Sequence, residues 1–132
     1  MPLTLEKFLG ELIALMKQDH SRELQKMIKE TRGLTWLQTL DGEDALIQVT
    51  ADDVVIAKKA KPGKIDARVT LSRKTLFDLL EGSITLNDAL QGKQVKALGD
   101  PVTLLKCYKI WYQILLLARN SPRFYFLTYQ LR

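Results

Sequence analysis

Residues 67–100 constrain the fold of this chain more than any other stretch, because four elements and their boundaries follow one another there. Over residues 67–71 apolar and polar side chains alternate strictly, which is the period of a strand with one buried and one solvent-exposed face. Ser72 stands at the N-cap position of a helix, since apolar side chains follow it at helical spacing. Gly82 ends that helix, because glycine adopts the left-handed conformation at little cost.

A second short helix and a second strand follow within the same stretch. Thr85, with Asp88 three residues later, resembles a capping box, and Gly92 closes the short helix that this box would begin. Residues 95–98 can return as a strand. A strand, a helical crossover and a returning strand predict a parallel pair, and such crossovers are almost always right-handed.

The order of these pieces resembles the sterol carrier protein 2 (SCP2) sterol-binding domain family. Its members commonly read A-x-V-T-L at a strand, then a short helix with a Gly-Lys-like turn, a small helix, Gly-Lys, a strand and Gly-Asp. The residues in those places here are Ala67-Arg68-Val69-Thr70-Leu71, Leu79-Leu80-Glu81-Gly82, Gln91-Gly92-Lys93 and Gly99-Asp100. One residue more than usual before Gly99 leaves the register of residues 94–98 open, since a one-residue slip turns every side chain of a strand over.

The resemblance implies an α/β (α+β) domain in which helices pack on one face of a five-stranded mixed β-sheet. It also implies an apolar tunnel between sheet and helices, where the family binds sterols, acyl chains and other lipids. Large apolar side chains gather in residues 76–90 and 104–117, so they are the candidate walls of such a tunnel. These ligand-binding candidates are Leu76, Phe77, Leu80, Leu86, Leu90, Leu104, Tyr108, Trp111, Tyr112 and Leu115.

Residues 1–30 are predicted to form an N-terminal helical segment, because apolar side chains recur every three or four positions. The apolar stripe weakens around Asp19-His20-Ser21, so the segment is either one long helix or two helices with a hinge. His20 lies on the stripe without a cluster of acids or thiols around it. A satisfied or partly exposed histidine is therefore favoured over a catalytic base.

Strand-like patterns replace the helical pattern after Gly33. The predicted strands cover residues 34–40, 45–50 and 54–59. Connections this short make an antiparallel meander, and a polar loop with Pro62-Gly63 leads on to residue 67. Trp36 is expected to be a core or pocket aromatic. The acidic residues between the strands lack the ligand order of a calcium loop, so we interpret them as turn formers.

A strong helix is predicted over residues 101–118, with Asp100 as its N-cap and Pro101 at its first position. Its narrow polar stripe consists of Lys106, Lys109 and Gln113. A helix so apolar on its remaining circumference must be buried on several sides, against a ligand, a partner subunit, a membrane surface or the C-terminal extension at residues 119–132. In that extension the aromatic residues form either a final helical turn or a strand.

Length and composition indicate a single folded domain over residues 1–132, since 46% of the residues are hydrophobic and the charge content is ordinary. One cysteine excludes an internal disulfide and fits a reducing compartment, and no uncharged run approaches the ~20 residues of a membrane span. We therefore expect a cytoplasmic protein. The net charge of +5 is scattered rather than gathered along a stripe, so no nucleic-acid partner is expected.

Motifs for catalysis, cofactors and metals are lacking in this sequence. One histidine and one cysteine stand on different elements, and there is no glycine-rich phosphate loop and no zinc-ligand spacing. We expect no catalytic residue, no cofactor and no metal, and we expect Cys107 to be a buried, inert thiol.

The function favoured by the resemblance is non-catalytic binding or carriage of a hydrophobic lipid-like ligand, such as a sterol, a fatty acyl chain or an isoprenoid. Transient contact with a membrane surface and formation of a homodimer are compatible with it. The alternative is a dimerisation or accessory interaction module, for example in the assembly of enzymes that make lipids or isoprenoid quinones. An enzyme subunit with its catalytic partner on another chain is a third reading.

Overall fold

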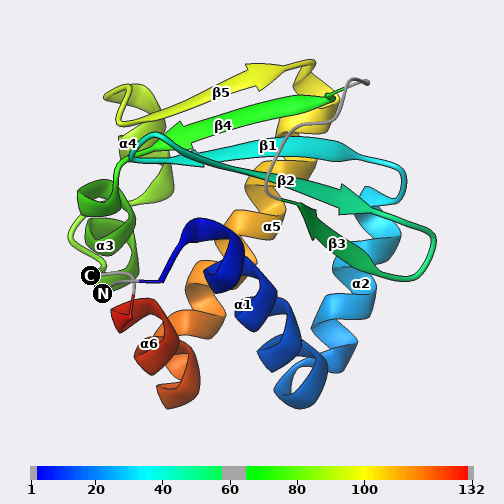
Figure 1. Ribbon diagram of the computed structural model, residues 1–132. Helices are drawn as coiled ribbons and strands as arrows, with labels where there is room; N and C mark the ends of the chain where they lie inside the picture. The colour runs from blue at the N-terminus through cyan, green and yellow to red at the C-terminus, as the bar shows by residue number, and fades with distance from the viewer. Residues whose placement is uncertain (1–2, 58–64, 131–132) are drawn as a thin grey trace.

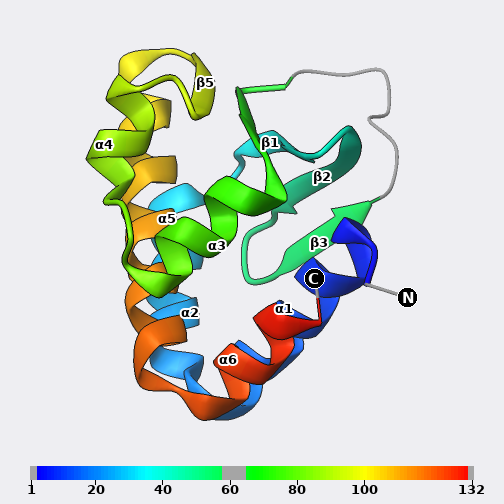
Figure 2. The same cartoon turned by 90° about the vertical axis from the view of Figure 1, so that its left-hand side faces the viewer.

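The computed structural model describes residues 3–57 and 65–130, and it shows a curved sheet with helices gathered on one side (Figures 1 and 2). This arrangement confirms the predicted α+β domain with a five-stranded mixed sheet. The elements, in chain order, are α1 (Leu5–Asp19), α2 (Ser21–Thr31), β1 (Thr35–Leu40), β2 (Glu43–Val49), β3 (Val54–Ala57), β4 (Ala67–Leu71), α3 (Arg73–Glu81), α4 (Leu86–Gln91), β5 (Val95–Gly99), α5 (Pro101–Asn120) and α6 (Pro122–Tyr129).

The strands lie in the order β3-β2-β1-β4-β5. The first three form the predicted antiparallel meander, and β1 runs parallel to β4, with Leu40 opposite Leu71. Asp41 (φ 49°) and Gly42 (φ 82°) make the two-residue turn between β1 and β2, as expected for an Asp-Gly hairpin. The predicted loop with Pro62-Gly63 lies outside the described residues.

The parallel pair predicted for the strands within residues 67–100 is wrong. β4 and β5 are antiparallel, with Leu71 opposite Val95 and Ala67 opposite Gly99. The reason is that the α3–α4 crossover returns the chain at the same end of the sheet, with the first residue of β5 opposite the last residue of β4. Figure 1 shows both α3 and α4 at the end of the sheet where β4 stops, so β5 starts beside that end and runs back.

The capping residues of the crossover act as predicted at three places. Ser72 Oγ accepts a hydrogen bond from the N–H of Thr75 (3.1 Å), and Thr85 Oγ1 accepts one from the N–H of Asp88 (3.1 Å). Gly82 has a φ of 79°, the left-handed conformation that ends a helix. The local sequence therefore determines where α3 and α4 begin and where α3 ends.

The end of α4 and the register of β5 are features that the structure decides. Gly92 closes α4 with a φ of −79°, and Lys93 takes the left-handed conformation instead, with a φ of 60°. In the β5 register, Val95 lies opposite Leu71 and Ala97 lies opposite Val69. The side chains at 95 and 97 consequently share the inner face with the apolar side chains of β4.

The N-terminal segment forms two helices that meet at His20. The backbone of His20 (φ −140°) is outside the helical region, so α1 ends there and α2 starts at Ser21. The His20 ring lies 5.6 Å from the ring of Phe124, a fully buried residue of α6, and its Nε2 is buried without a hydrogen-bond partner among the described residues. His20 therefore packs the hinge against the C-terminal helix.

The described part of the C-terminal extension is helical. Asp100 caps α5 by accepting a 3.0 Å hydrogen bond from the N–H of Thr103, and Ser121 caps α6 in turn. Helix α6 packs against α1 and α5, and the Leu3 N–H donates to the carbonyl of Gln130 (3.0 Å). None of the helices in the described part of the chain is long and apolar enough to cross a membrane.

Candidate apolar binding cavity

A cavity of about 550 Å³ lies between the β4–β5 half of the sheet and helices α3, α4 and α5. Its walls are formed almost entirely by apolar side chains. The lining residues are Val69, Leu71, Leu76, Leu79, Leu86, Leu90, Lys93, Val95, Lys96, Ala97, Leu98, Leu104, Cys107, Tyr108, Trp111 and Leu115.

The sheet wall follows from strand alternation and from the β4–β5 register. Val69 and Leu71 lie on the buried face of β4, while Arg68 and Thr70 face solvent. Because Ala97 pairs with Val69 and Val95 with Leu71, all four apolar side chains point to the same side. The small side chain of Ala97 leaves room at the centre of this wall.

The helical walls come from three elements that present their apolar faces to the cavity. Helix α3 contributes Leu76 and Leu79, which lie three positions apart on one face. Helix α4, only six residues long, contributes Leu86 and Leu90 at a four-residue spacing. The side chains from α5 are Leu104, Cys107, Tyr108, Trp111 and Leu115.

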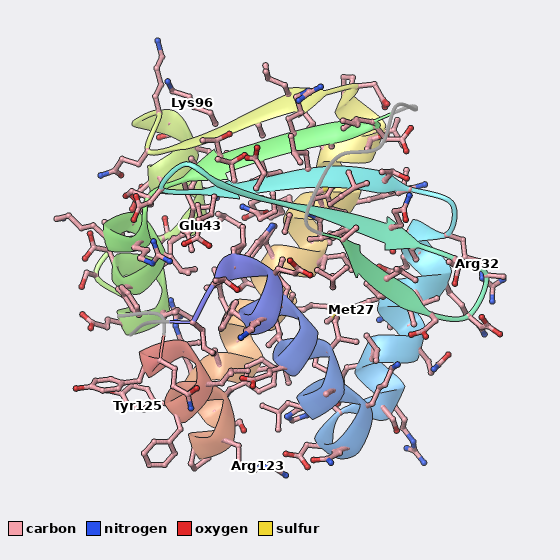
Figure 3. All side chains as sticks on the ribbon, in the orientation of Figure 1. Met27, Arg32, Glu43, Lys96, Arg123 and Tyr125 are labelled. Atoms are coloured by element: carbon pink, nitrogen blue, oxygen red, sulfur yellow. The ribbon has the colours of Figure 1, made fainter. Side chains whose placement is uncertain are left out.

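Polar groups border the cavity at its rim. Lys93 and Lys96 line its edge, and Figure 3 shows the Lys96 side chain extending away from the sheet. The Tyr108 hydroxyl, on an exposed site, donates a 3.0 Å hydrogen bond to Asn87 Oδ1 of α4. The charged side chains among the described lining residues are therefore Lys93 and Lys96, both exposed, and the rest of the lining offers shape and mainly apolar surface.

The inner wall includes the ionisable side chain of Cys107, which is buried. Burial, and secondly the negative charge of Asp66, raise the pKa of the Cys107 thiol to about 11. A thiol with this pKa stays protonated at neutral pH and is a poor nucleophile and a poor metal ligand. Within the described part of the chain, no group of three or more histidine, cysteine or acidic side chains is placed to hold a metal ion.

Seven of the ten candidates from the sequence line this cavity: Leu76, Leu86, Leu90, Leu104, Tyr108, Trp111 and Leu115. Phe77 and Leu80 instead border a separate hollow of about 210 Å³ with Tyr125 and Tyr129 of α6. They lie on the next face of α3, which borders this hollow together with residues of α5 and α6. Tyr112 is 49% exposed and stacks on the outer side of Tyr108, with 6.2 Å between the rings.

The sequence reasoning missed the sheet wall. Alternation over residues 67–71 held the signal for Val69 and Leu71, which the sequence marks as the buried face of a strand. Val95 and Ala97 had no such signal, because their side depends on a register that the local sequence leaves open.

No protein-family model matches the sequence, and no curated protein matches it either. Solved structures do match, over most of this chain. One is a UbiJ-SCP2 ubiquinone synthesis protein (TM-score 0.62, 16% identity, 92% of this chain and 98% of that chain). Another is the sterol carrier protein domain 2 of Helicoverpa armigera (TM-score 0.61, 17% identity, 87% of each chain).

A third match is sterol carrier protein 2 from Yarrowia lipolytica in its apo form, with a TM-score of 0.57 and 22% identity over 89% of this chain and 91% of that chain. Identities this low relate the proteins through their architecture. In this chain that architecture is the mixed five-stranded sheet with helices on one of its faces. The chain therefore has the fold of the sterol carrier protein 2 domain.

Proposed function

We propose that this protein reversibly binds a lipid-like apolar molecule in the cavity beneath β4 and β5, without catalysing a reaction on it. The observation that carries the proposal is the apolar cavity of about 550 Å³, a size within the range of small-molecule sites. Two of the structural matches are named sterol carrier proteins, which supports a ligand of this class. Sterols, fatty acyl chains and isoprenoids are all apolar molecules of the class that such a cavity could hold.

The driving force would be the removal of apolar surface from water. A sixteen-carbon chain gains roughly 12 kcal/mol on full burial, at about 0.8 kcal/mol per CH₂ group. Association costs on the order of 4–15 kcal/mol in lost freedom, so the net affinity is expected in the micromolar range. Such an affinity allows release as well as capture.

Selection would rest on shape, because no charged side chain belongs to the inner wall formed by Val69, Ala97, Leu76, Leu90 and Trp111. A charged group within the walls would lose its hydration without gaining a partner. A ligand's polar end would therefore stay at the mouth, in reach of water.

Native mass spectrometry of the freshly purified protein tests the proposal directly, because it reports bound lipid by mass. Ala97→Trp places a large ring in the centre of the sheet wall and should abolish co-purified ligand and weaken titration by fluorescent sterol, fatty-acid and quinone probes. Thr70→Trp is the matched control, since Thr70 is exposed on the opposite face of the neighbouring strand. Absence of binding by the wild type to all three probe classes would contradict the proposed function.

Exchange with a lipid surface would require transient membrane contact, and α6 offers suitable side chains. Tyr125, Phe126 and Tyr129 are 57%, 68% and 57% exposed, and aromatic residues partition well into the membrane interface. Figure 3 shows Tyr125 extending away from the body of the protein. The fraction of protein that co-sediments with phosphatidylglycerol vesicles should be lower for Phe126→Ser than for the wild type.

An accessory interaction module remains the second candidate function, and an exposed apolar face of α5 favours it. That face includes Leu105 and Tyr112, which are 55% and 49% exposed. One structural match is named a ubiquinone synthesis protein, a setting in which such a module would fit. A ligand-free protein that forms a defined complex would decide for this candidate.

A further inference from the structure

Helix α5 carries a row of side chains that no other element in the described part of the chain covers. Val102, Leu105, Tyr112 and Leu116 are 64%, 55%, 49% and 39% exposed, and the exposed Lys109 lies on the same row. Their spacing alternates between three and four residues. This is the a/d spacing of a coiled-coil seam, and we refer to these five residues as the outer stripe.

The outer stripe is separate from the part of α5 that packs inside the domain. Thr103, Cys107 and Ile110 are buried against the rest of the chain on the other side of the helix. Figure 2 shows α5 along one border of the molecule, passing from α4 towards α6. A helix with one face in the core normally presents polar residues on the other, so the outer stripe calls for a partner.

We propose that the outer stripe is a homodimer interface, in which α5 of one copy packs antiparallel to α5 of a second copy. In antiparallel coiled-coil packing, a positions of one helix face d positions of the other. A two-fold axis near the middle of α5 then sets Leu105 against Leu116 of the second copy, twice by symmetry. The same axis sets Lys109 against Tyr112 of the second copy.

Both pairings are chemically favourable. The leucines bury aliphatic surface against each other, and an ammonium group over a tyrosine ring gains a cation–π attraction. A parallel pair in register would instead put Lys109 against Lys109 and Tyr112 against Tyr112. The repulsion between the two lysines therefore selects the antiparallel arrangement.

The position of Lys109 also favours a second copy over a lipid surface as the partner of the outer stripe. Lys109 lies in the middle of the outer stripe, between Leu105 and Tyr112. A stripe that entered a membrane interface would have to bury this ammonium among apolar residues, whereas basic residues of interfacial helices lie on the polar face. The second copy supplies a tyrosine ring at that point.

Sedimentation velocity over a range of protein concentrations tests the dimer, and this test does not depend on ligand binding. The wild type should dimerise reversibly, and Leu105→Glu should raise the dimer dissociation constant about tenfold or more, since it sets a carboxylate in the seam against Leu116 of the second copy. Phe126→Glu is the matched control, because Phe126 is 68% exposed on α6 and lies outside the outer stripe. Circular dichroism checks that each variant is folded.

Cysteine cross-linking tests the orientation. A mixture of Leu105→Cys and Leu116→Cys proteins should form a disulfide-linked dimer, while Leu105→Cys alone should not. The native Cys107 is 3% exposed and does not compete. The proposal is overturned by a wild type that stays monomeric at every concentration, by a dimer insensitive to Leu105→Glu, or by cross-linking of Leu105→Cys to itself. A monomer that adsorbs to phosphatidylglycerol vesicles through Leu105 and Leu116 would likewise overturn it and would assign the outer stripe to lipid.

Discussion

The carboxylate of Glu43 accepts a 2.8 Å hydrogen bond from the guanidinium group of Arg73 and a 2.7 Å hydrogen bond from the backbone N–H of Leu5. Glu43, labelled in Figure 3, starts β2, and its two partners start α3 and α1, so one side chain joins three elements. The N–H of Leu5 belongs to the first turn of α1, where helices leave donors unpaired and favour a negative charge.

The first prediction concerns this junction. The hydrogen bond from Arg73, followed by that from Leu5, holds the pKa of Glu43 below its usual value of 4.5. The carboxylate therefore stabilises the folded state above pH 4.5, and its contribution is lost as the pH falls through the lowered folded-state value. Glu43→Gln should reduce the free energy of unfolding by about 1 kcal/mol or less at pH 7, since both partners are partly exposed.

Urea unfolding at pH 7 and at acidic pH measures this effect. The difference between Glu43→Gln and the wild type should shrink as the pH falls below 4.5. Glu11→Gln, an exposed position in the middle of α1, should behave like the wild type at both pH values. A difference that is constant with pH would show that the charge of Glu43 is not what matters.

The second prediction concerns Cys107 in the cavity wall. Its pKa of about 11, against 9.0 for an unperturbed thiol, leaves roughly a hundredfold less thiolate at neutral pH. The rate at which iodoacetamide alkylates Cys107 should be lower in the folded protein than in the unfolded protein by at least that factor. Unfolding in urea should restore the rate of an ordinary thiol. Rapid alkylation of the folded protein would mean that the cavity wall opens readily.

A consequence for stability follows from the same thiol. Because the folded state disfavours the thiolate, the free energy of unfolding should decline as the pH rises from 9.0 through about 11. Cys107→Ala removes this titration, so its stability should decline less over that interval. If the free energy of unfolding fell equally in both proteins at alkaline pH, groups other than Cys107 would be responsible for the decline.

The third prediction concerns the packing of α6. Phe124 is 0% exposed and contacts the His20 ring at the hinge between α1 and α2, so Phe124→Ala should cost about 3–5 kcal/mol of stability. Phe126→Ala, at a position that is 68% exposed, should change stability by less than about 0.5 kcal/mol. Thermal unfolding of the two variants compares them directly, and equal effects would show that α6 is not part of the core.

The fourth prediction concerns Gly99 at the end of β5. Its φ is +154°, and a Cβ atom there would lie 2.8 Å from the backbone oxygen of Asp66. Gly99→Ala should therefore cost about 1–3 kcal/mol, through strain and displacement of the neighbouring backbone. Gly10→Ala is the opposite case, since an added Cβ meets nothing within 4 Å on α1.

Chemical denaturation of both glycine variants completes the comparison. Gly10→Ala should stabilise the protein by about 0.5–1 kcal/mol, because alanine is the better helix former. If Gly99→Ala proved as stable as the wild type, the close approach of β5 to residue 66 would not be a constraint on the fold.

Local sequence determined the elements of this protein and most of their boundaries. The N-caps of α3 and α4 are Ser72 and Thr85, and the C-cap of α3 is Gly82. These residues could be identified from the sequence because capping depends on side chains and backbone preferences within a few residues. The apolar spacing of α5 likewise indicated four of the side chains that line the cavity, Leu104, Tyr108, Trp111 and Leu115, because a helix fixes which residues share a face.

Tertiary structure alone decided how those elements meet. The direction of β5 depends on where the α3–α4 pair returns the chain, and no side chain of β5 encodes that direction. The same pairing put Val95 and Ala97 into the cavity wall, while the packing of α3 against α5 directed Phe77 and Leu80 to a different hollow. Tyr112 does not line the cavity, because the elements packed around α5 together determine which side of this helix is buried. Pairing direction and the choice of buried face are properties of contacts between distant residues, and a local pattern leaves them undetermined.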